Sequence, residues 1–166
     1  RYGKNVFEGG FLGLDNIGIF DRSAPLPTGG SLEQADGTAW MALFSQNMLE
    51  MSVELTALDP SYEDMVVKFV DHFYFIAAAM NTPGADSMWD DEDGFYYDLL
   101  RLPDGSSQLL KVRSLVGLLP LCATTVIEPE QRNRVPRAME FIKERQRRIP
   151  ELVKAIHPTG EGNFGV

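Results

Sequence analysis

Carboxylates and aromatic rings are interleaved in one short stretch of this sequence, residues 86–98, which contains no basic residue. The acidic members are Asp86, Asp90, Asp91, Glu92, Asp93 and Asp98, and the aromatic members are Trp89, Phe95, Tyr96 and Tyr97. Carboxylates accept hydrogen bonds from sugar hydroxyls, and aromatic faces stack on the apolar C–H faces of sugar rings. The stretch therefore indicates a sugar-contacting surface. The plainer alternative is a solvated acidic turn beside aromatic rings that fill a core.

The same carboxylates do not match an EF-hand calcium loop. If Gly94 takes the sixth loop position, Trp89 falls at the first position and Leu100 at the twelfth. Neither side chain can coordinate calcium. The single cysteine, Cys122, excludes a cysteine-rich zinc site, and no metal site is predicted.

Asp15 lies among apolar residues and glycines between Gly9 and Gly18. A carboxyl group among apolar side chains is desolvated, which raises its pKa toward that of a useful general acid. However, Asp followed by Asn near glycines more often closes a turn, and Asp36 stands where it would cap a helix. The residues alone thus favour structural roles for both Asp15 and Asp36.

The charge balance restricts the class of partner. The chain has 166 residues, with 15 basic and 24 acidic side chains and a net charge of −9. This excess disfavours nucleic acids and anionic membranes as partners, and no apolar run is long enough to span a membrane. Basic residues gather between residues 132 and 148, where they are expected to form a solvated helix face. Their charges are expected to pair with acids of the same protein or of a partner.

Two long antiparallel helices are predicted between residues 38 and 80, because only a short link at Asp59-Pro60 separates them. Large apolar side chains recur every three or four residues and predict one buried stripe on each helix. The first stripe is Met41, Phe44, Met48, Met51, Leu55 and Leu58, and the second is Tyr62, Met65, Phe69, Phe73, Ile76 and Met80. The glycine-rich residues 1–37 are expected to form a packed loop.

A β-hairpin is predicted within the acidic and aromatic segment 86–112, at residues 95–112, because Pro103-Asp104-Gly105 is typical of a turn. Residues 113–158 are predicted to form further helices, limited by Pro120 and Pro150. The chain is thus predicted to be mostly helical, with one hairpin. It begins with Arg1 rather than methionine and is expected to be a piece of a longer protein.

Four segments occur in an order that resembles glycoside hydrolase family 63, the family of processing α-glucosidases and mannosylglycerate hydrolases. They are Gly13-Leu14-Asp15-Asn16, then Glu33 to Trp40, then Trp89 to Asp98, then Lys111 to Leu121. The resemblance covers about Asn5 to Pro158. It implies an (α/α)6 toroid, of which residues 1–166 form a single segment, with residues 1–37 as an active-site loop. Similarity to the bacterial glucosidase-like members implies a cytoplasmic bacterial protein.

The resemblance also implies a reaction, the hydrolysis of α-glycosides with inversion by an Asp general acid and a later Glu general base. The acid motif falls on Asp15, and no cofactor is predicted. The residues implied to contact the substrate are Asn16, Asp36, Trp40, Trp89, Phe95, Tyr96, Tyr97 and Asp98. No residue matches the base motif, so the chain alone is expected to be inactive without the remainder of its parent chain.

We therefore predict a fragment of an inverting α-glycoside hydrolase that acts on a glucoside or a related oligosaccharide. Two alternatives remain open. One is a carbohydrate-binding module without catalysis, and the other is a helical protein-interaction domain that uses the segregated charge. A downstream Glu motif in the parent gene would favour the hydrolase over the binding module.

Overall fold

The computed structural model describes residues 5–8, 10, 17, 21–27, 29–82 and 84–148. Of these residues, 52% are helical and 14% lie in strands. The chain divides into two compact units, each of which is described by itself. The sheet unit comprises residues 1–43 and 75–123, and the helical unit comprises residues 44–74 and 124–166.

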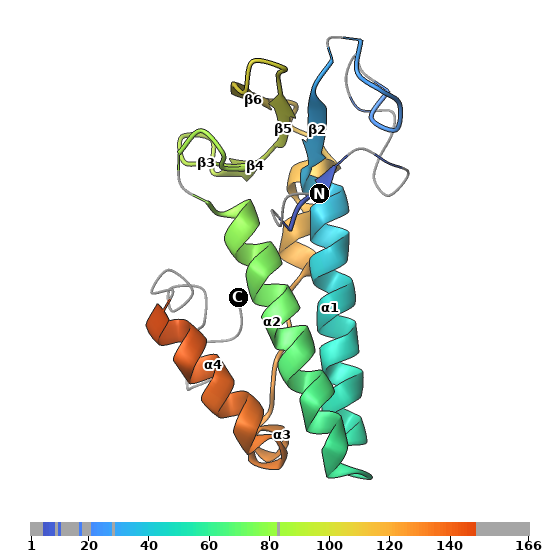
Figure 1. Ribbon diagram of the computed structural model, residues 1–166, viewed down its shortest axis with the longest axis vertical. Coiled ribbons are helices and arrows are strands. Elements are labelled where there is room, and N and C mark those ends of the chain that lie inside the picture. The colour runs from blue at the N-terminus through green and yellow to red at the C-terminus, as the bar shows by residue number, and fades with distance from the viewer. Residues whose placement is uncertain are drawn as a thin grey trace. The chain divides into compact units, whose positions relative to one another are not determined.

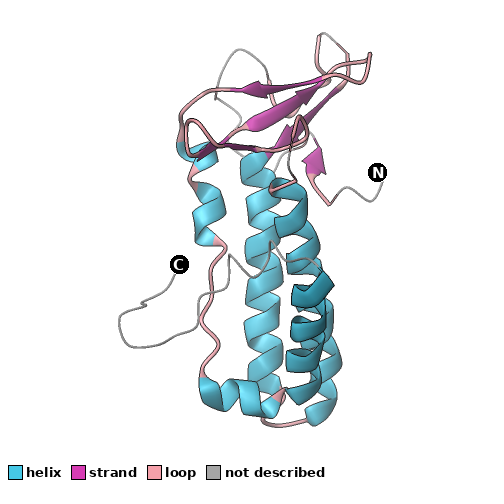
Figure 2. Ribbon diagram, turned by 90° about the vertical axis from the view of Figure 1, so that its left-hand side faces the viewer, coloured by secondary structure: helices cyan, strands magenta, loops and turns pink. Residues whose placement is uncertain are grey.

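The predicted fold class, a mostly helical segment of an (α/α)6 toroid with one hairpin, is wrong. The sheet unit contains a four-stranded antiparallel sheet in the order β1-β2-β5-β6 and a separate two-stranded sheet of β3 and β4 (Figure 1). The strands are drawn in magenta in Figure 2. Helices therefore share the described chain with a sheet that the toroid does not provide.

The four-stranded sheet joins the beginning of the chain to its middle. Its strands are β1 (Phe7–Glu8), β2 (Ser31–Gln34), β5 (Asp98–Arg101) and β6 (Ser107–Leu110). In the register, Leu32 of β2 lies opposite Leu100 of β5, and Leu99 of β5 lies opposite Leu109 of β6. The hairpin predicted around Pro103-Asp104-Gly105 is confirmed, because β5 and β6 pair antiparallel across that turn. Its bounds are narrower than the predicted 95–112, since Phe95 and Tyr96 belong to β4 and pair with β3.

The smaller sheet and two 3-10 helices complete the sheet unit. The strands β3 (Trp89–Asp90) and β4 (Phe95–Tyr96) form a tight hairpin, followed later by η2 (Leu115–Gly117) and η3 (Leu119–Cys122). A core of Ala35, Met80, Met88 and Val116 lies beneath them. Gly117 is required where η2 approaches β4, because an added Cβ would lie 2.1 Å from the Phe95 ring and 2.3 Å from the Tyr96 carbonyl oxygen.

Two long helices are confirmed, with bounds that differ from those predicted: α1 (Ala35–Leu55) and α2 (Glu63–Met80), linked through η1 (Pro60–Tyr62). The buried face of α1 differs from the predicted one. Its buried residues are mostly small or polar. By contrast, four of the six side chains in the predicted stripe, Phe44, Met48, Met51 and Leu55, are exposed on the helix, and Leu58 is exposed just after its end. The buried members are Ala35, Asp36, Thr38, Ala39, Ala42, Ser45, Gln46, Leu49, Ser52 and Val53.

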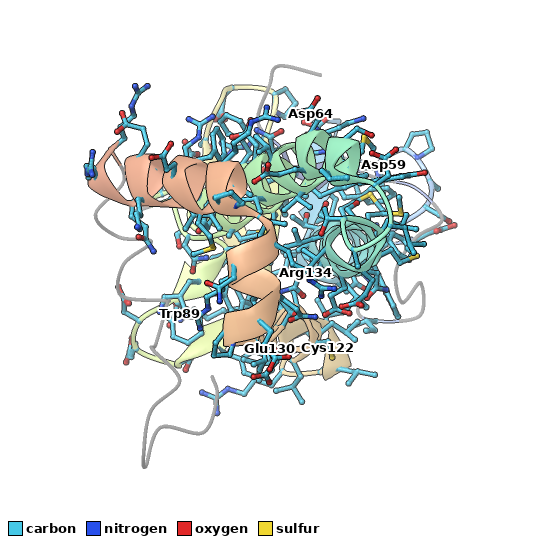
Figure 3. The ribbon with its side chains drawn as sticks, turned by 90° about the horizontal axis from the view of Figure 1, so that it is seen from below. Asp59, Asp64, Trp89, Cys122, Glu130 and Arg134 are labelled. Atoms are coloured by element: carbon cyan, nitrogen blue, oxygen red, sulfur yellow. The ribbon has the colours of Figure 1, made fainter. Side chains whose placement is uncertain are left out.

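The helical unit packs the second half of α1 and the first half of α2 against α4 (Pro136–Arg148). The short α3 (Pro129–Arg134) precedes α4 and runs across its direction (Figure 3). The buried core consists of Leu49, Val53, Val66, Val70, Tyr74, Val135 and Ala138. Burial raises the pKa of the Tyr74 hydroxyl to about 12, which keeps it protonated at neutral pH.

Acidic residues of α2 hold the basic α4 in place. The buried carboxylate of Glu63 accepts hydrogen bonds from the backbone N–H groups of Arg137 and Ala138, at 2.6 and 3.2 Å, so it caps the first turn of α4. Arg137 also pairs with Asp64 at 2.7 Å, and Arg145 pairs with Asp71. Much of the segregated charge seen in the sequence is therefore paired within the helical unit.

Candidate functional site

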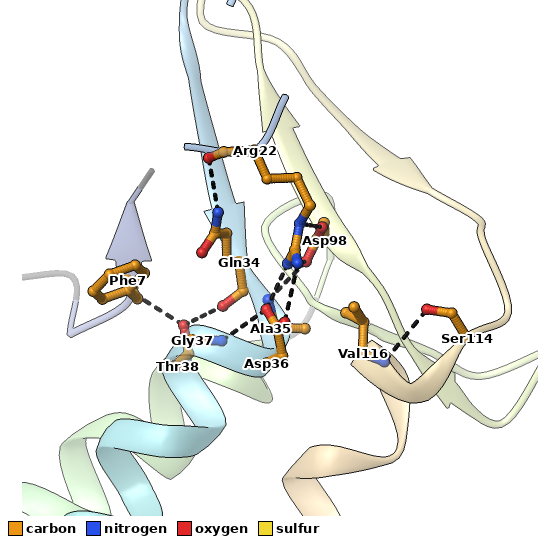
Figure 4. Close-up of polar contacts among 10 residues, drawn as sticks. All are labelled: Phe7, Arg22, Gln34, Ala35, Asp36, Gly37, Thr38, Asp98, Ser114 and Val116. Atoms are coloured by element: carbon orange, nitrogen blue, oxygen red, sulfur yellow. Dashed lines mark hydrogen bonds and ion pairs between the residues drawn. The ribbon is translucent and has the colours of Figure 1, made fainter. Parts of the chain in front are cut away.

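A buried cluster of three charged residues lies where the sheet meets the first turn of α1 within the sheet unit (Figure 4). Arg22 comes from the segment before β2, Asp36 from α1 and Asp98 from the start of β5. The Arg22 side chain is 2% exposed and that of Asp36 is 0% exposed. Charged residues are almost never buried to this extent unless they are paired.

The guanidinium of Arg22 donates to both carboxylates. Its two terminal nitrogens lie 2.5 and 3.0 Å from the two Asp36 oxygens, which is a bidentate arrangement. One of them also donates to Oδ1 of Asp98 at 3.0 Å, and Nε lies 2.9 Å from Oδ2 of Asp98. Arg22 thus links two acids that are far apart in the sequence.

The backbone at the beginning of α1 fixes the same carboxylates. Asp98 accepts the Ala35 N–H at 2.9 Å, and Asp36 accepts the Gly37 N–H at 2.8 Å. The side-chain amide of Gln34 donates to the carbonyl oxygen of Arg22 at 2.9 Å (Figure 4). The N–H groups at a helix N-terminus carry partial positive charge, which favours carboxylates there. The helix consequently begins at Ala35 rather than at Thr38.

Burial raises the pKa of the Asp98 carboxyl group above its ordinary value, because the charged form loses its contact with water. The positive charge of Arg22 and the hydrogen bond from Ala35 act in the opposite direction. The cluster holds two carboxylates against one guanidinium, so its formal charge is −1 when both acids are ionised.

A cavity of about 800 Å³ opens beside this cluster, entirely within the sheet unit. Its wall includes Arg22 and Asp98 together with serines and apolar side chains. The serines are Ser87, Ser107 and Ser114, and the apolar residues include Ile17, Leu32, Leu109, Leu110, Val112 and Val116. A concave, mostly apolar surface with a few polar groups is typical of small-ligand sites, and this volume falls in their usual range.

The aromatic residues proposed to contact sugar lie elsewhere in the sheet unit. Trp89 and Tyr96 pack edge to face, with ring centroids 4.9 Å apart, and Phe95 and Tyr97 lie 5.3 Å apart. The Tyr96 hydroxyl donates to Asn81 at 2.8 Å. Only the Trp89–Tyr96 contact crosses the β3–β4 hairpin, and none of the four rings is in the cavity wall.

Two of the acids at the turn between β3 and β4, Asp90 and Asp93, pair with bases that follow β6. Lys111 lies 2.7 Å from Asp90 and 3.1 Å from Asp93, and Arg113 lies 2.5 Å from Asp93. Lys111 is the main reason that the pKa values of Asp90 and Asp93 are lowered. Among the described residues, no group of three His, Cys, Asp or Glu side chains is placed to hold a metal ion.

The structure places the remaining predicted site residues as follows. Asp15 and Asn16 lie outside the described residues. Trp40 is half-buried on α1 and is not part of the cavity wall. Sequence reasoning named Asp36 and Asp98 but missed Arg22, which joins them. The sequence contains no direct signal for Arg22, because Arg101 is the base closest to Asp98 along the chain, yet it pairs with Glu33 and Asp86.

The chain was compared with known proteins at three levels. It matches none of the known protein families, and no solved structure matches it. It is 51% identical, over 140 residues, to a Saccharomyces cerevisiae protein named "Uncharacterized protein YMR196W". The match covers 76% of this chain but 13% of the yeast protein, so the chain spans about one eighth of the length of that relative. None of the described helices is long and apolar enough to cross a membrane.

Proposed function

We propose that this chain is part of a longer glycoside hydrolase, similar in chemistry to family 63, that cleaves α-glucosides or related oligosaccharides with inversion. The proposal concerns the reaction and not the toroid, which the structure contradicts. The observation that carries it is the Arg22–Asp36–Asp98 cluster at the wall of the cavity. A carboxyl group, serines and apolar side chains together suit a ligand that has hydroxyl groups on an apolar ring.

Each residue of the cluster has a proposed role. Asp98 accepts a hydrogen bond from a sugar hydroxyl, and Arg22 orients the Asp98 carboxylate and opposes the rise in its pKa. Asp36 contacts Arg22 with both of its oxygens and is fully buried, so it positions Arg22 rather than the sugar. Asp15 is proposed as the general acid that gives a proton to the leaving oxygen.

Inversion needs a second carboxyl group about 6.5–9.5 Å from the first, with a water molecule between them. We propose that this general base belongs to the part of the longer protein outside these 166 residues. The 166-residue chain alone would then bind sugar without hydrolysing it. Sugar binding can therefore be tested separately from the reaction.

The reaction is tested on the protein expressed from its complete gene. Cleavage of an α-glucoside should release the β-anomer first, as seen by proton NMR. Asp15→Asn should lower the rate on a poor leaving group by about 10²–10⁴-fold, and by much less on α-glucosyl fluoride, which needs little protonation. Asp21→Asn changes an exposed carboxylate a short distance further along the sequence and serves as the matched control.

No hydrolysis of any α-glycoside, or release of the α-anomer, would contradict the proposed reaction. Equal losses in Asp15→Asn across both leaving groups would remove Asp15 as the acid.

Binding is tested on the 166-residue chain with deoxynojirimycin, a cationic glucose mimic, by titration calorimetry. Asp98→Asn should weaken binding about tenfold or more, while Asp91→Asn, on an exposed acid of the β3–β4 turn, should leave it unchanged. The unfolding midpoint of each variant shows whether the fold is retained. If Asp98→Asn bound deoxynojirimycin as tightly as the unsubstituted 166-residue chain, the cavity would no longer be the proposed sugar site.

A further inference from the structure

One part of the cavity wall is formed by residues 84–87, named here the wall segment, which lies between α2 and β3 in the chain. Gly84, Ala85 and Ser87 line the cavity, whereas Asp86 does not. The Ser87 N–H donates to the Gly84 carbonyl oxygen at 3.1 Å and closes a turn. The position of this turn against the sheet therefore affects the shape of the cavity.

Two contacts attach the wall segment to the four-stranded sheet. The Asp86 carboxylate pairs with Nη1 of Arg101 in β5 at 2.5 Å. The hydroxyl of Ser107 in β6 donates to the Ala85 carbonyl oxygen at 2.7 Å. Neither Asp86 nor Arg101 is in the cavity wall, so their ion pair acts on the cavity through the wall segment.

The two members of this ion pair differ in how firmly they are held. Arg101 donates from Nε and Nη2 to the two carboxylate oxygens of Glu33, at 2.6 and 3.1 Å, and the Glu33 side chain is 2% exposed. The Asp86 side chain is 56% exposed. If Asp86 leaves, Arg101 keeps its bidentate contact with Glu33, and the Asp86 carboxylate is hydrated. Arg101 is therefore the fixed member of the pair, and the wall segment is the part that moves.

An ion pair with an exposed member responds to salt. Exposed pairs contribute little to stability, and dissolved ions screen them. The released and the paired states of Asp86 are thus close in free energy, and either salt or the loss of the Asp86 charge shifts the balance toward release. A cavity whose wall is released buries less of the surface of a ligand and binds it more weakly.

We propose that the Arg101–Asp86 pair is a salt-sensitive clasp that positions the wall segment and thereby sets the affinity of the cavity for its ligand. Asp86 is a positioning residue, because it acts through the wall segment and does not touch the ligand. The inference rests on the proposed function for the identity of that ligand, a sugar. The contacts of the clasp do not depend on sugar chemistry, so the clasp and the sugar site can fail separately.

Maltose binding to the 166-residue chain, followed by NMR titration, tests the effect on affinity. Maltose is uncharged, so salt does not screen the ligand itself. We expect Asp86→Asn to weaken binding about two- to fivefold while leaving the unfolding midpoint unchanged, because the lost ion pair is exposed. Raising the ionic strength from about 0.01 M to about 1 M should weaken binding by the unsubstituted chain but not by Asp86→Asn.

Two further variants separate the clasp from a general effect of charge. Asp86→Glu retains the carboxylate and should restore both the affinity and its dependence on salt. Glu92→Gln removes one negative charge from an exposed position in the β3–β4 turn and should bind maltose as the unsubstituted chain does.

Amide hydrogen exchange tests the position of the wall segment in the absence of any ligand. In Asp86→Asn we expect the Ser87 N–H to exchange severalfold faster than in the unsubstituted chain, because release of the clasp loosens the turn that this group closes. The amides of Leu99 and Leu100 in β5 should exchange at unchanged rates, since the sheet itself stays intact.

Three results would overturn the clasp. The first is unchanged exchange of Ser87 in Asp86→Asn, and the second is equal salt dependence of maltose binding in Asp86→Asn and the unsubstituted chain. The third is a lower unfolding midpoint with faster exchange throughout β5, which would show a purely structural role. If the unsubstituted chain bound no maltose, the proposed sugar site would fail instead, and the exchange of Ser87 would by itself decide whether the clasp positions the wall segment.

Discussion

Arg22 contacts acids that lie 14 and 76 residues away along the chain, and its loss would remove the cation that both of these buried carboxylates contact. We expect Arg22→Met to lower the free energy of unfolding by about 3–5 kcal/mol, the usual effect of breaking a buried ion pair on one side. Urea unfolding of the 166-residue chain measures this loss, with Lys68→Met as an exposed control.

The same variant should become less stable as the pH rises. Burial already raises the pKa of Asp98, and without Arg22 only the hydrogen bond from the Ala35 N–H still opposes that effect. A carboxyl group whose pKa is higher in the folded protein than in the unfolded chain, where it is about 3.9, binds its proton more tightly when folded. Stability is therefore retained at low pH and falls as the pH rises past about 4. A loss of less than about 1 kcal/mol that does not change between pH 4.5 and 7.5 would contradict the proposed cluster.

Lys111 provides a second test at the residue scale. It is the main cause of the lowered pKa values of Asp90 and Asp93, so Lys111→Met should raise both toward about 3.9. Because these pKa values are lowered on folding, their contribution to stability is present above about pH 4 and is lost as the pH falls through the folded-state values. Carboxyl carbon NMR titration measures both pKa values, and an unchanged titration of Asp93 would contradict the pairing.

The sequence predicted the acids of the site but not their geometry. Asp36 and Asp98 were both named from the family resemblance, whereas Arg22 belongs to no periodic pattern and gave no signal of its own. Its role depends on a contact with Asp98, across most of the described chain, and local spacing carries no information about such contacts.

At the scale of elements, Gly117 allows η2 to lie against β4. We expect Gly117→Ala to lower the free energy of unfolding by about 1–3 kcal/mol, because the added methyl group would overlap the Phe95 ring and the Tyr96 carbonyl oxygen. Near-ultraviolet circular dichroism should show that the Trp89–Tyr96 pair is disturbed. Gly105→Ala, in the β5–β6 turn with φ 88° and open space around it, should cost only about 1 kcal/mol.

If Gly105→Ala proved the more harmful of the two, the close approach of η2 to β4 would not be a determinant of stability.

Elements with strong local signals were predictable, and those built by distant contacts were not. The helix pair follows from its periodicity, and the β5–β6 hairpin follows from its turn residues. Strand β2 was not predicted, because its polar residues Glu33 and Gln34 do not indicate a buried strand. They are buried because Arg101 pairs with Glu33, and because the Gln34 amide donates a hydrogen bond to the carbonyl oxygen of Arg22. The buried face of α1 was assigned wrongly because periodicity locates an apolar face without showing what covers it.

At the scale of the whole molecule, the 166-residue chain should behave as a folded protein with exposed apolar surface. We expect it to bind the dye ANS at neutral pH while keeping a cooperative unfolding transition, which distinguishes it from a molten globule. Phe44→Lys with Met51→Lys should reduce the dye signal at least twofold, and Asn133→Lys should not. Dye fluorescence no higher than that of a compact control protein would contradict the exposure of Met48, Met51 and Leu55 on α1.

The Arg22–Asp36–Asp98 cluster also has a kinetic consequence. It closes only when the segment before β2, the first turn of α1 and the start of β5 have all come together, and closing so long a loop carries an entropic cost. We expect this long-range contact to form after the folding transition state. Arg22→Met would then leave the refolding rate of the chain nearly unchanged and accelerate its unfolding. The cluster would therefore slow the unfolding of the native structure without guiding its formation.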